Sequence, residues 1–208
     1  MRTSYADLRF LPDRFYPDGM ASTDIEVSMD PWVHLASPQP RAAFTRYPAY
    51  YAKSIVVAVD GACLYNGRAQ ARASLGVYWG ANNYFNTGIV LDPTDRQTNQ
   101  VAELQACLEA LGNLDDVSCA HPAGDRLSTV VIKSDSEYMV RGITEWFPSW
   151  RNQRWRNYRG MPVTNLEYFR MIDEYIEDWE AQGLSVKFWL VPRSMNRMAD
   201  GLAKDALH

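Results

Sequence analysis

Residues 54–60 read SIVVAVD, and Gly61 follows them directly. An unbroken run of apolar and mostly β-branched side chains of this length is typical of a buried strand, and the glycine predicts a turn after it. The run ends in a carboxylate. The carboxyl ends of sheet strands are where open α/β folds place their ligand sites. The stretch therefore predicts a buried strand that presents Asp60 at a functional edge of a sheet.

After Gly61, regularly spaced turn residues divide the chain into segments from which the rest of the fold can be predicted. Apolar runs bounded by turn residues predict strands, and apolar residues at helical spacing predict helices, the second of which should stop at Pro148. The predicted strands are 54–60, 73–79, 84–90, 128–134 and 184–191, and the predicted helices are 98–111, 136–146, 164–181 and a terminal one around Met195–Leu202. This order favours an α/β fold with a five-stranded mixed sheet flanked by helices, in which an antiparallel three-stranded meander adjoins two parallel strands.

Composition narrows the class of protein. The chain has 208 residues, a net charge of -4 and three cysteines without CxxC spacing. The cysteine pattern excludes a disulfide framework and a cysteine zinc knuckle. No apolar leader opens the sequence, and no apolar run is long enough for a membrane span. We expect an intracellular protein that is not secreted, has no membrane contact and no evident protein partner, and is monomeric.

The first 52 residues differ from the rest. Six of the eleven prolines lie there, and the segment shows no long amphipathic helix and no alternating strand. We interpret residues 1–52 as an extended or loosely packed extension of unassigned role, and residues 53–208 as the folded domain. The aromatic residues of the extension indicate that parts of it pack on the domain: Phe10, Phe15, Tyr16, Trp32 and Phe44.

Four acidic residues have unusual settings. Asp60 and Asp135 each follow a buried strand, Glu103 lies beside the apolar stripe of a helix, and Asp200 follows Asn196 by four residues, on one helix face. If the two strands are neighbours, the carboxylates converge, and like charges that close need a cation. Hard oxygen ligands suit Mg²⁺ or Mn²⁺. The alternative is that each acid caps a turn or a helix.

Four blocks of sequence resemble the signature motifs of type 1 ribonuclease H. They are Asp60–Cys63 (DGAC), Gln97–Leu104 (QTNQVAEL), Ser134–Ser136 (SDS) and Asn196–Ala203 (NRMADGLA), in the family's order and spacing. The resemblance covers roughly residues 54–207. It implies a ribonuclease H-like fold and an endonuclease that hydrolyses the RNA strand of RNA–DNA hybrids, leaving 5′-phosphate and 3′-hydroxyl ends.

The resemblance also implies the cofactor. In that family the four carboxylates hold two Mg²⁺ ions, for which Mn²⁺ substitutes. By similarity, Asp60 bridges both ions and Asp200 helps to hold the ion that activates the attacking water. Glu103 and Asp135 help to hold the ion at the leaving oxygen. Two ions about 3.5–4 Å apart stabilise both oxygens of an in-line displacement.

A basic and aromatic stretch is the candidate substrate surface. Residues 141–159 contain five Arg and one Glu, interleaved with Trp146, Trp150, Trp155 and Tyr158. Such residues supply phosphate affinity and flat surfaces for sugars or bases, although Trp146 and Trp150 have the alternative role of core aromatics. The resemblance implies four groups: a DNA channel of Tyr138, Trp146 and Trp150, a DNA-phosphate pocket of Arg96, Thr98 and Asn165, a basic protrusion of Arg151, Arg154, Trp155, Arg156 and Arg159, and RNA-strand contacts from Asn66, Asn99 and Gln100.

Two features depart from the family pattern. Many members carry a glycine-flanked histidine loop before the last helix, whereas residues 189–200 read WLVPRSMNRMAD. The chain resembles the branch with a short link, and Arg193 is the candidate substitute. Asn66 has the simpler alternative of a turn residue before Gly67. Two other functions stay open: a non-catalytic hybrid-binding protein of the same fold, and a retroelement or transposase-like nuclease.

Overall fold

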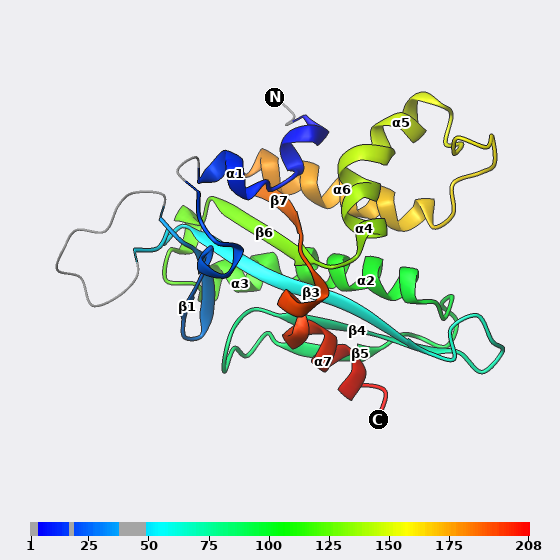
Figure 1. Cartoon of the computed structure of the whole chain (residues 1–208), viewed down its shortest axis with the longest axis horizontal. Helices are drawn as coiled ribbons and strands as arrows, with labels where there is room; N and C mark the ends of the chain where they lie inside the picture. The colour runs from blue at the N-terminus through cyan, green and yellow to red at the C-terminus, as the bar shows by residue number, and fades with distance from the viewer. Residues whose placement is uncertain (1–3, 17–18, 38–48) are drawn as a thin grey trace.

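The computed structural model describes residues 4–16, 19–37 and 49–208, and its centre is a five-stranded sheet (Figure 1). The strand order is β5-β4-β3-β6-β7. Strands β3, β4 and β5 form an antiparallel meander, and β6 and β7 continue the sheet in parallel with β3. The mixed sheet predicted from the sequence is therefore confirmed. The strands are β3 Ser54–Leu64, β4 Arg72–Tyr78, β5 Thr87–Val90, β6 Thr129–Ser134 and β7 Ser185–Leu190.

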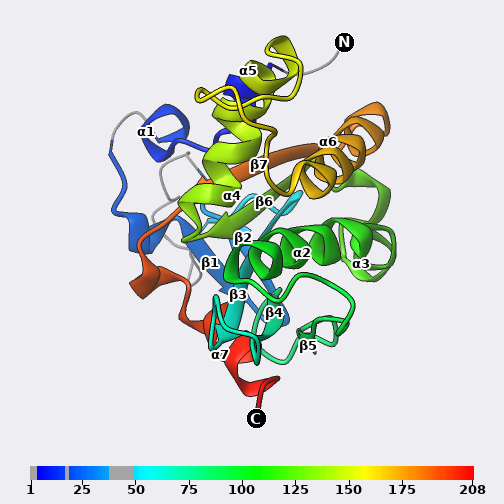
Figure 2. The ribbon, with the colours of Figure 1, turned by 90° about the vertical axis from the view of Figure 1, so that its right-hand side faces the viewer.

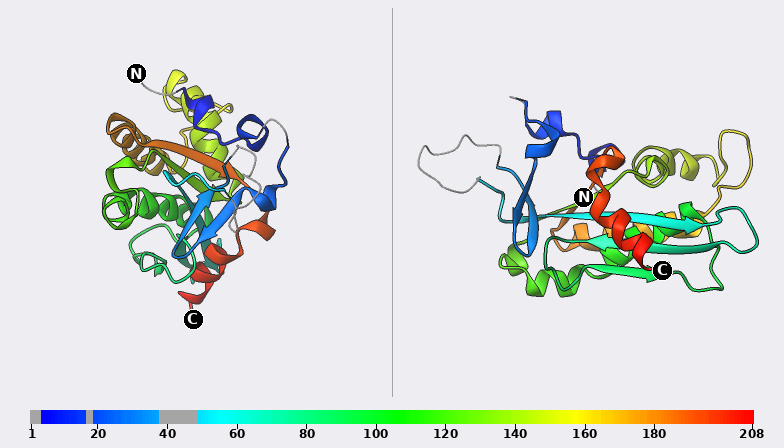
Figure 3. Two further views of the ribbon diagram at one scale, coloured as in Figure 1. Left: turned by 90° about the vertical axis from the view of Figure 1, so that its left-hand side faces the viewer. Right: turned by 60° about the horizontal axis from the view of Figure 1, so that its bottom comes forward.

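Helices cover both faces of this sheet. Helix α2 packs on β3 and β4 and contacts α6, whereas α7 lies over β3, β4 and β5 on the other face (Figures 2 and 3). The helical elements of this part of the chain are α2 Asn99–Gly112, α3 Leu114–Ala120, η3 Gly124–Arg126, α4 Glu137–Arg141, η4 Gly142–Trp146, α5 Phe147–Asn152, α6 Leu166–Ala181, η5 Arg193–Met195 and α7 Arg197–Asp205.

Side chains alternate along β3 between two apolar clusters. Ile55, Val57 and Val59 join the larger core beneath α2, and Val56 joins a second cluster on the opposite face. Because successive residues of a strand point to opposite faces, β3 is buried on both. This explains the continuous apolar run in its sequence.

The helical segment after β6 differs from the sequence prediction. It continues past Pro148, through the π-helical turn η4 into α5. Pro148 is the second residue of α5, where a missing backbone N–H removes no hydrogen bond within a newly started helix. The wider π turn thus lets a proline follow helical backbone without ending it.

The N-terminal segment is more ordered than the sequence indicated. It contains η1 Tyr5–Leu8, α1 Pro12–Phe15, η2 Ser22–Asp24 and an antiparallel hairpin of β1 Glu26–Met29 and β2 Trp32–Leu35. The hairpin was not predicted from the sequence, which shows no alternating strand here. All four residues of β2 are buried, so the strand has no alternating pattern to detect.

The aromatic residues of the N-terminal segment pack unevenly on the domain. Phe10, Tyr16 and Trp32 are buried, whereas Phe15 is 40% exposed, and Phe44 lies outside the described residues. The backbone N–H of Phe10 donates to the carbonyl of Phe188 in β7. Phe10 and Tyr16 belong to the second apolar cluster, so this segment covers part of the sheet face opposite α2. Within the described ranges, no helix is both long and apolar enough to cross a membrane.

Candidate active site

Asp60 and Gly61 lie within β3, where the strand meets the start of α2. The turn expected at Gly61 was a wrong prediction, because the strand continues to Leu64 and Gly61 pairs with Leu75 of β4. A Cβ atom at Gly61 would collide with the backbone of Ala102 and Glu103, so only glycine allows the helix to approach this closely. The same contact brings Glu103 beside Asp60. The Asp-Gly pair of the sequence therefore has a physical role: one residue supplies a carboxylate and the next allows a second carboxylate to reach it.

Asp135 lies level with Asp60, directly after the neighbouring strand β6. Strands β3 and β6 are parallel and Ala58 pairs with Lys133, so the two aspartates, each two residues further along, end at the same height. Asn196 ties this edge to the turn before α7. Its Nδ2 donates to Asp135 Oδ1 at 2.8 Å and to the carbonyl of Val59 at 3.0 Å, and the residue is 1% exposed.

Glu103 is held by neutral donors from two elements. Asn99, one turn earlier on α2, donates to Oε1 at 2.7 Å, and the hydroxyl of Ser136 donates to Oε2 at 2.5 Å. Ser136 also caps α4, because its Oγ accepts from the Met139 backbone N–H. Both oxygens of the carboxylate are thereby oriented before any ligand binds.

Asp200 has a different environment. Arg193 Nη2 lies 2.9 Å from its Oδ1, and Lys204 Nζ lies 2.7 Å from its Oδ2. Lys204 follows Asp200 by one turn of α7, an i,i+4 ion pair, and Arg193 comes from η5. Asp200 is thus the member of the cluster that already has cationic partners.

The other three carboxylates lie within electrostatic reach of Asp60. Burial, together with the charges of Asp135, Asp200 and Glu103, raises the pKa of Asp60 to about 7. Burial also raises the pKa of Glu103 to about 7, against the hydrogen bonds from Ser136 and Asn99. Burial pushes the pKa of Asp200 upward as well, but Lys204 and Arg193 outweigh it and lower that pKa.

The donor set fits a hard divalent cation. Two buried carboxylates whose charge is unfavourable without a counter-charge are what such an ion would stabilise, and oxygen ligands are those that Mg²⁺ and Mn²⁺ prefer. Within the described part of the chain, no three His, Cys, Asp or Glu side chains stand at metal-binding spacing. The carboxylates are neighbours, with Asp200 held by its two cations.

The residues expected to grip a DNA phosphate also come together. Arg96 Nη1 donates to Asn165 Oδ1 at 3.2 Å, across 69 positions of sequence. Thr98 is the N-cap of α2, where its Oγ1 accepts from the Val101 backbone N–H. Asn165 adopts a left-handed conformation with φ of 58° and is buried. A guanidinium beside a helix N-terminus is a setting that favours an anion.

The expected RNA-strand contacts surround the start of α2. The backbone N–H of Asn99 lies 3.4 Å from Asn66 Oδ1, so the turn after β3 meets the helix here. Gln100 is exposed on the first turn. The side-chain amide of Asn99 donates a hydrogen bond to Glu103, which places it beside one of the four carboxylates.

The expected channel aromatics form a connected row. Ring centroids are 6.3 Å apart for Tyr138 and Trp146 and 6.0 Å for Trp146 and Trp150. Phe169 of α6 supports the row, 5.4 Å from Tyr138 and 5.1 Å from Trp150. All three residues of the row are partly exposed. Tyr138 and Trp150 also pack against the core, so Trp150 combines a core contact with an exposed surface.

Within the expected protrusion, the arginines and Trp155 are placed differently. Trp155 lies 5.4 Å from Phe147, and the guanidinium of Arg170 is 4.3 Å from its ring centroid. This tryptophan fastens the loop to α5 and α6. Tyr158 is 84% exposed. The four arginines of the protrusion are exposed: Arg151, Arg154, Arg156 and Arg159.

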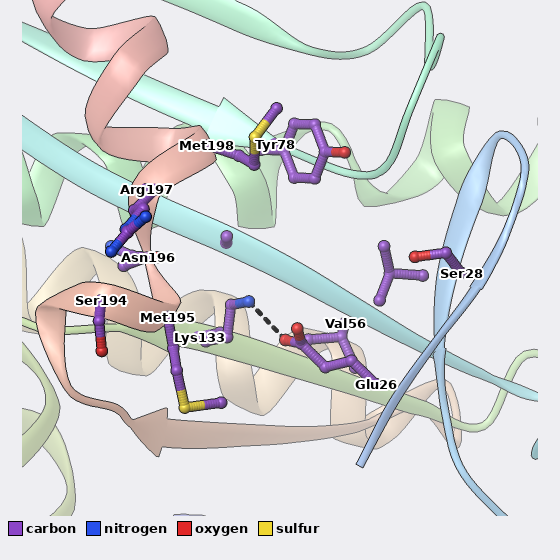
Figure 4. A pocket seen from close by; sticks show the side chains of 12 residues that line it. Glu26, Ser28, Val56, Tyr78, Lys133, Ser194, Met195, Asn196, Arg197 and Met198 are labelled. Atoms are coloured by element: carbon purple, nitrogen blue, oxygen red, sulfur yellow. Dashed lines mark ion pairs between the residues drawn. The ribbon is translucent and has the colours of Figure 1, made fainter. Parts of the chain in front are cut away.

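A cavity lies on the face of β3 that carries Val56 and Ala58. It has a volume of ≈ 340 Å³ between the N-terminal hairpin and the turn Ser194–Met198 (Figure 4). Lys133 is buried in it, with Nζ 2.5 Å from Glu26 Oε1 of β1. The N-terminal segment thus supplies the counter-charge of a lysine two residues before Asp135.

Sequence reasoning missed three residues that organise the site: Ser136, Asn196 and Lys204. Ser136 and Asn196 lie inside the motifs, but their hydrogen bonds to Glu103 and Asp135 join segments 33 and 61 positions apart. Lys204 had a detectable signal, because an Asp followed by a Lys at i+4 predicts a helical ion pair.

A mixed β5-β4-β3-β6-β7 sheet with acidic side chains gathered beside Asp60 defines a ribonuclease H-like domain. The RNase H family model matches residues 52–208, so the chain belongs to that family. Ribonuclease H1 of Rattus norvegicus is 35% identical over 161 residues, which cover 76% of this chain and 51% of the relative. The chain therefore spans about half the length of that relative.

Two further comparisons extend this result. Ribonuclease HI of Pseudomonas aeruginosa is 32% identical over 124 residues, covering 60% of this chain and 74% of the relative. Among solved structures, the foamy viral protease-reverse transcriptase in complex with an RNA/DNA hybrid is similar with a TM-score of 0.53 and 17% identity, covering 82% of this chain and 22% of that chain. The structural likeness concerns the fold.

Proposed function

We propose that this protein is a divalent-cation-dependent endonuclease that hydrolyses the RNA strand of RNA–DNA hybrids. The observation that carries the proposal is the approach of three carboxylates to Asp60 of β3: Asp135 directly after β6, Glu103 of α2 and Asp200 of α7. Membership of the RNase H family and the ribonuclease names of its relatives support it. The products would carry 5′-phosphate and 3′-hydroxyl ends.

Asp60, Glu103, Asp135 and Asp200 would hold two Mg²⁺ ions, or Mn²⁺ in their place. When bound, two such ions stabilise the entering and leaving oxygens of an in-line displacement. The chain's own residues prepare for this. Asn196 orients Asp135, and Asn99 and Ser136 orient both oxygens of Glu103. Burial beside other carboxylates makes Asp60 a favourable ligand, because a cation relieves its unfavourable charge.

The substrate would lie across two surfaces. Arg96, Thr98 and Asn165 would bind a phosphate of the DNA strand, beside the aromatic row Tyr138, Trp146 and Trp150. The amides Asn66, Asn99 and Gln100 would contact the RNA strand near Glu103, since an amide can both donate to and accept from a 2′-hydroxyl. The exposed arginines of the protrusion would add phosphate affinity.

The test is cleavage of a strand-labelled RNA–DNA hybrid with Mg²⁺. We expect internal cuts in the RNA strand alone, and no cutting of duplex DNA or duplex RNA. The products should carry 5′-phosphate and 3′-hydroxyl ends, which a ligase can rejoin without further treatment. Asp60→Asn is the matched control and should bind the hybrid without cutting it. Intact RNA at enzyme excess would leave only a hybrid-binding protein, and cleavage of duplex DNA would indicate the retroelement-like nuclease.

A further inference from the structure

The two cations on Asp200 distinguish it from its neighbours. Arg193 contacts one carboxylate oxygen at 2.9 Å and Lys204 the other at 2.7 Å, so each oxygen has its own positive partner. We call Arg193 and Lys204 the counter-ion pair. Glu103 instead accepts from the neutral groups of Asn99 and Ser136, and Asp60 accepts from the backbone N–H of Gly61.

Exposure shows that the counter-ion pair can be displaced. The side chains of Arg193 and Lys204 are 71% and 52% exposed, whereas that of Asp200 is 19% exposed. Exposed ion pairs contribute little free energy, because each side chain loses entropy in one geometry and water solvates the released charge well. A multivalent ion that also contacts the neighbouring carboxylates has a stronger attraction for the same oxygens.

Arg193 acts on more than Asp200. Its charge lowers the pKa of Glu103, and its own pKa is raised by the hydrogen bond to Asp200 and by the charges of Asp200, Asp135 and Asp60. The guanidinium therefore lies within the electrostatic reach of all four carboxylates. It stands in part for the positive charge that a bound ion would supply.

We propose that the counter-ion pair competes with a divalent cation for the oxygens of Asp200, and so sets the cation concentration at which the site fills. This rests on the proposed function, because it takes Asp200 to be a cation ligand. Binding of the ion to Asp200 releases both side chains into solvent. Arg193 and Lys204 are thus positioning residues: they hold both oxygens of Asp200 when no ion is present, and lower its apparent affinity for one.

The size of the effect follows from the strength of exposed ion pairs. Such pairs contribute about 0.2–1 kcal/mol, which corresponds to a change of about 1.5- to fivefold in a dissociation constant. Loss of either cation should therefore tighten Mn²⁺ binding by about two- to fivefold. Loss of both should tighten it by about tenfold at low salt, where exposed charges are least screened.

The experiment measures Mn²⁺ binding without substrate, as the midpoint of the Mn²⁺-dependent rise in Tm of the full chain, checked by calorimetry. The variants are Lys204→Met, Arg193→Met and the double variant, since methionine keeps much of the side-chain length. The matched control is Arg197→Met, an exposed arginine at the start of the same helix. We expect lower midpoints for the first three and little change for the control.

A double-mutant cycle separates direct competition from a general change in charge. In an Asp200→Asn background, Lys204→Met should no longer alter the Mn²⁺ midpoint, because the competed oxygens have lost their charge. An unchanged midpoint in Lys204→Met and Arg193→Met, or an equal shift in Arg197→Met, would overturn the competition. Absence of any Mn²⁺ effect on the unaltered protein would instead contradict the proposed function, so the two failures are distinguishable.

Discussion

The carboxylate cluster and the far end of the sheet both bury ionisable groups, but they neutralise them differently. Around Asp60 and Glu103, like charges meet and the hydrogen-bond partners are neutral. At the amino-terminal end of β3, His34 and His121 lie with ring centroids 5.3 Å apart, and burial lowers the pKa of both. There the neutral form is favoured, and His34 Nδ1 lies 2.6 Å from the carbonyl of Ser54.

A third arrangement lies between these two. Lys133, on the face of the sheet that carries the N-terminal hairpin, is buried but paired with Glu26. Burial alone therefore does not mark a functional group in this protein. What distinguishes Asp60 and Glu103 is burial beside other carboxylates with only neutral hydrogen-bond donors, so that their charged forms are costly unless a ligand relieves them.

The largest expected effect is that of Asp60→Asn. Cation stabilisation of the reacting oxygens is worth several kcal/mol, so cleavage of a hybrid should fall by at least about 10³-fold. The Tm without divalent cation should rise by a few degrees, because a buried charge among like charges is removed. Parallel cleavage assays and thermal melts check both. Wild-type cleavage would show that Asp60 is no ligand, and a lower metal-free Tm would show that its charge is not unfavourable.

The next effect concerns stability. Lys133→Met leaves Glu26 without its buried partner and should lower the free energy of unfolding by about 3 kcal/mol, measured by urea denaturation. The double variant Lys133→Met with Glu26→Gln should recover part of that loss, since no uncompensated charge remains. If the double variant were as unstable as the single one, lost packing rather than an unpaired charge would explain the effect of replacing Lys133. The contrast between the paired charge of Lys133 and the unpaired charge of Asp60 would then weaken.

The smallest effect is a pH dependence at the histidines. The pKa of His121 in the folded protein is lowered to about 4 by burial and by His34, against about 6.5 when unfolded. The unfolded chain therefore binds more protons between these values, and stability is lost as pH falls from about 6.5 to about 4, by at most about 1.4 kcal/mol per pH unit.

The variant His121→Gln isolates this effect. The raised pKa values of Asp60 and Glu103 act in the opposite direction, because they make stability fall as pH rises from about 4 to about 7. Both proteins carry the same carboxylates, so the carboxylate contribution cancels in the difference between the unfolding free energies of the unaltered protein and His121→Gln. That difference should shrink between pH 7 and pH 5. A difference independent of pH would mean that His121 titrates normally.

The sequence predicted the sheet, most helices and the four acids, because periodicity and turn residues are local signals. It did not predict the N-terminal hairpin. Strand β2 is buried along its whole length, and the apolar partners of this segment include Val131 and Trp189, about a hundred or more positions away. A segment that gains its stability from such distant contacts has little pattern of its own.

The sequence by itself determined which residues carry charge, and that Asp60 belongs to a buried strand, Asp135 follows one, and Glu103 and Asp200 belong to helices. Only the tertiary structure decided how each charge is partnered: Asn196 on Asp135, Ser136 on Glu103, and Arg193 with Lys204 on Asp200. Secondary structure depends on neighbours within a few residues. The pKa of a carboxylate depends on every group within a few ångströms, and the register of β3 with β6 and the docking of α2 and α7 choose those groups.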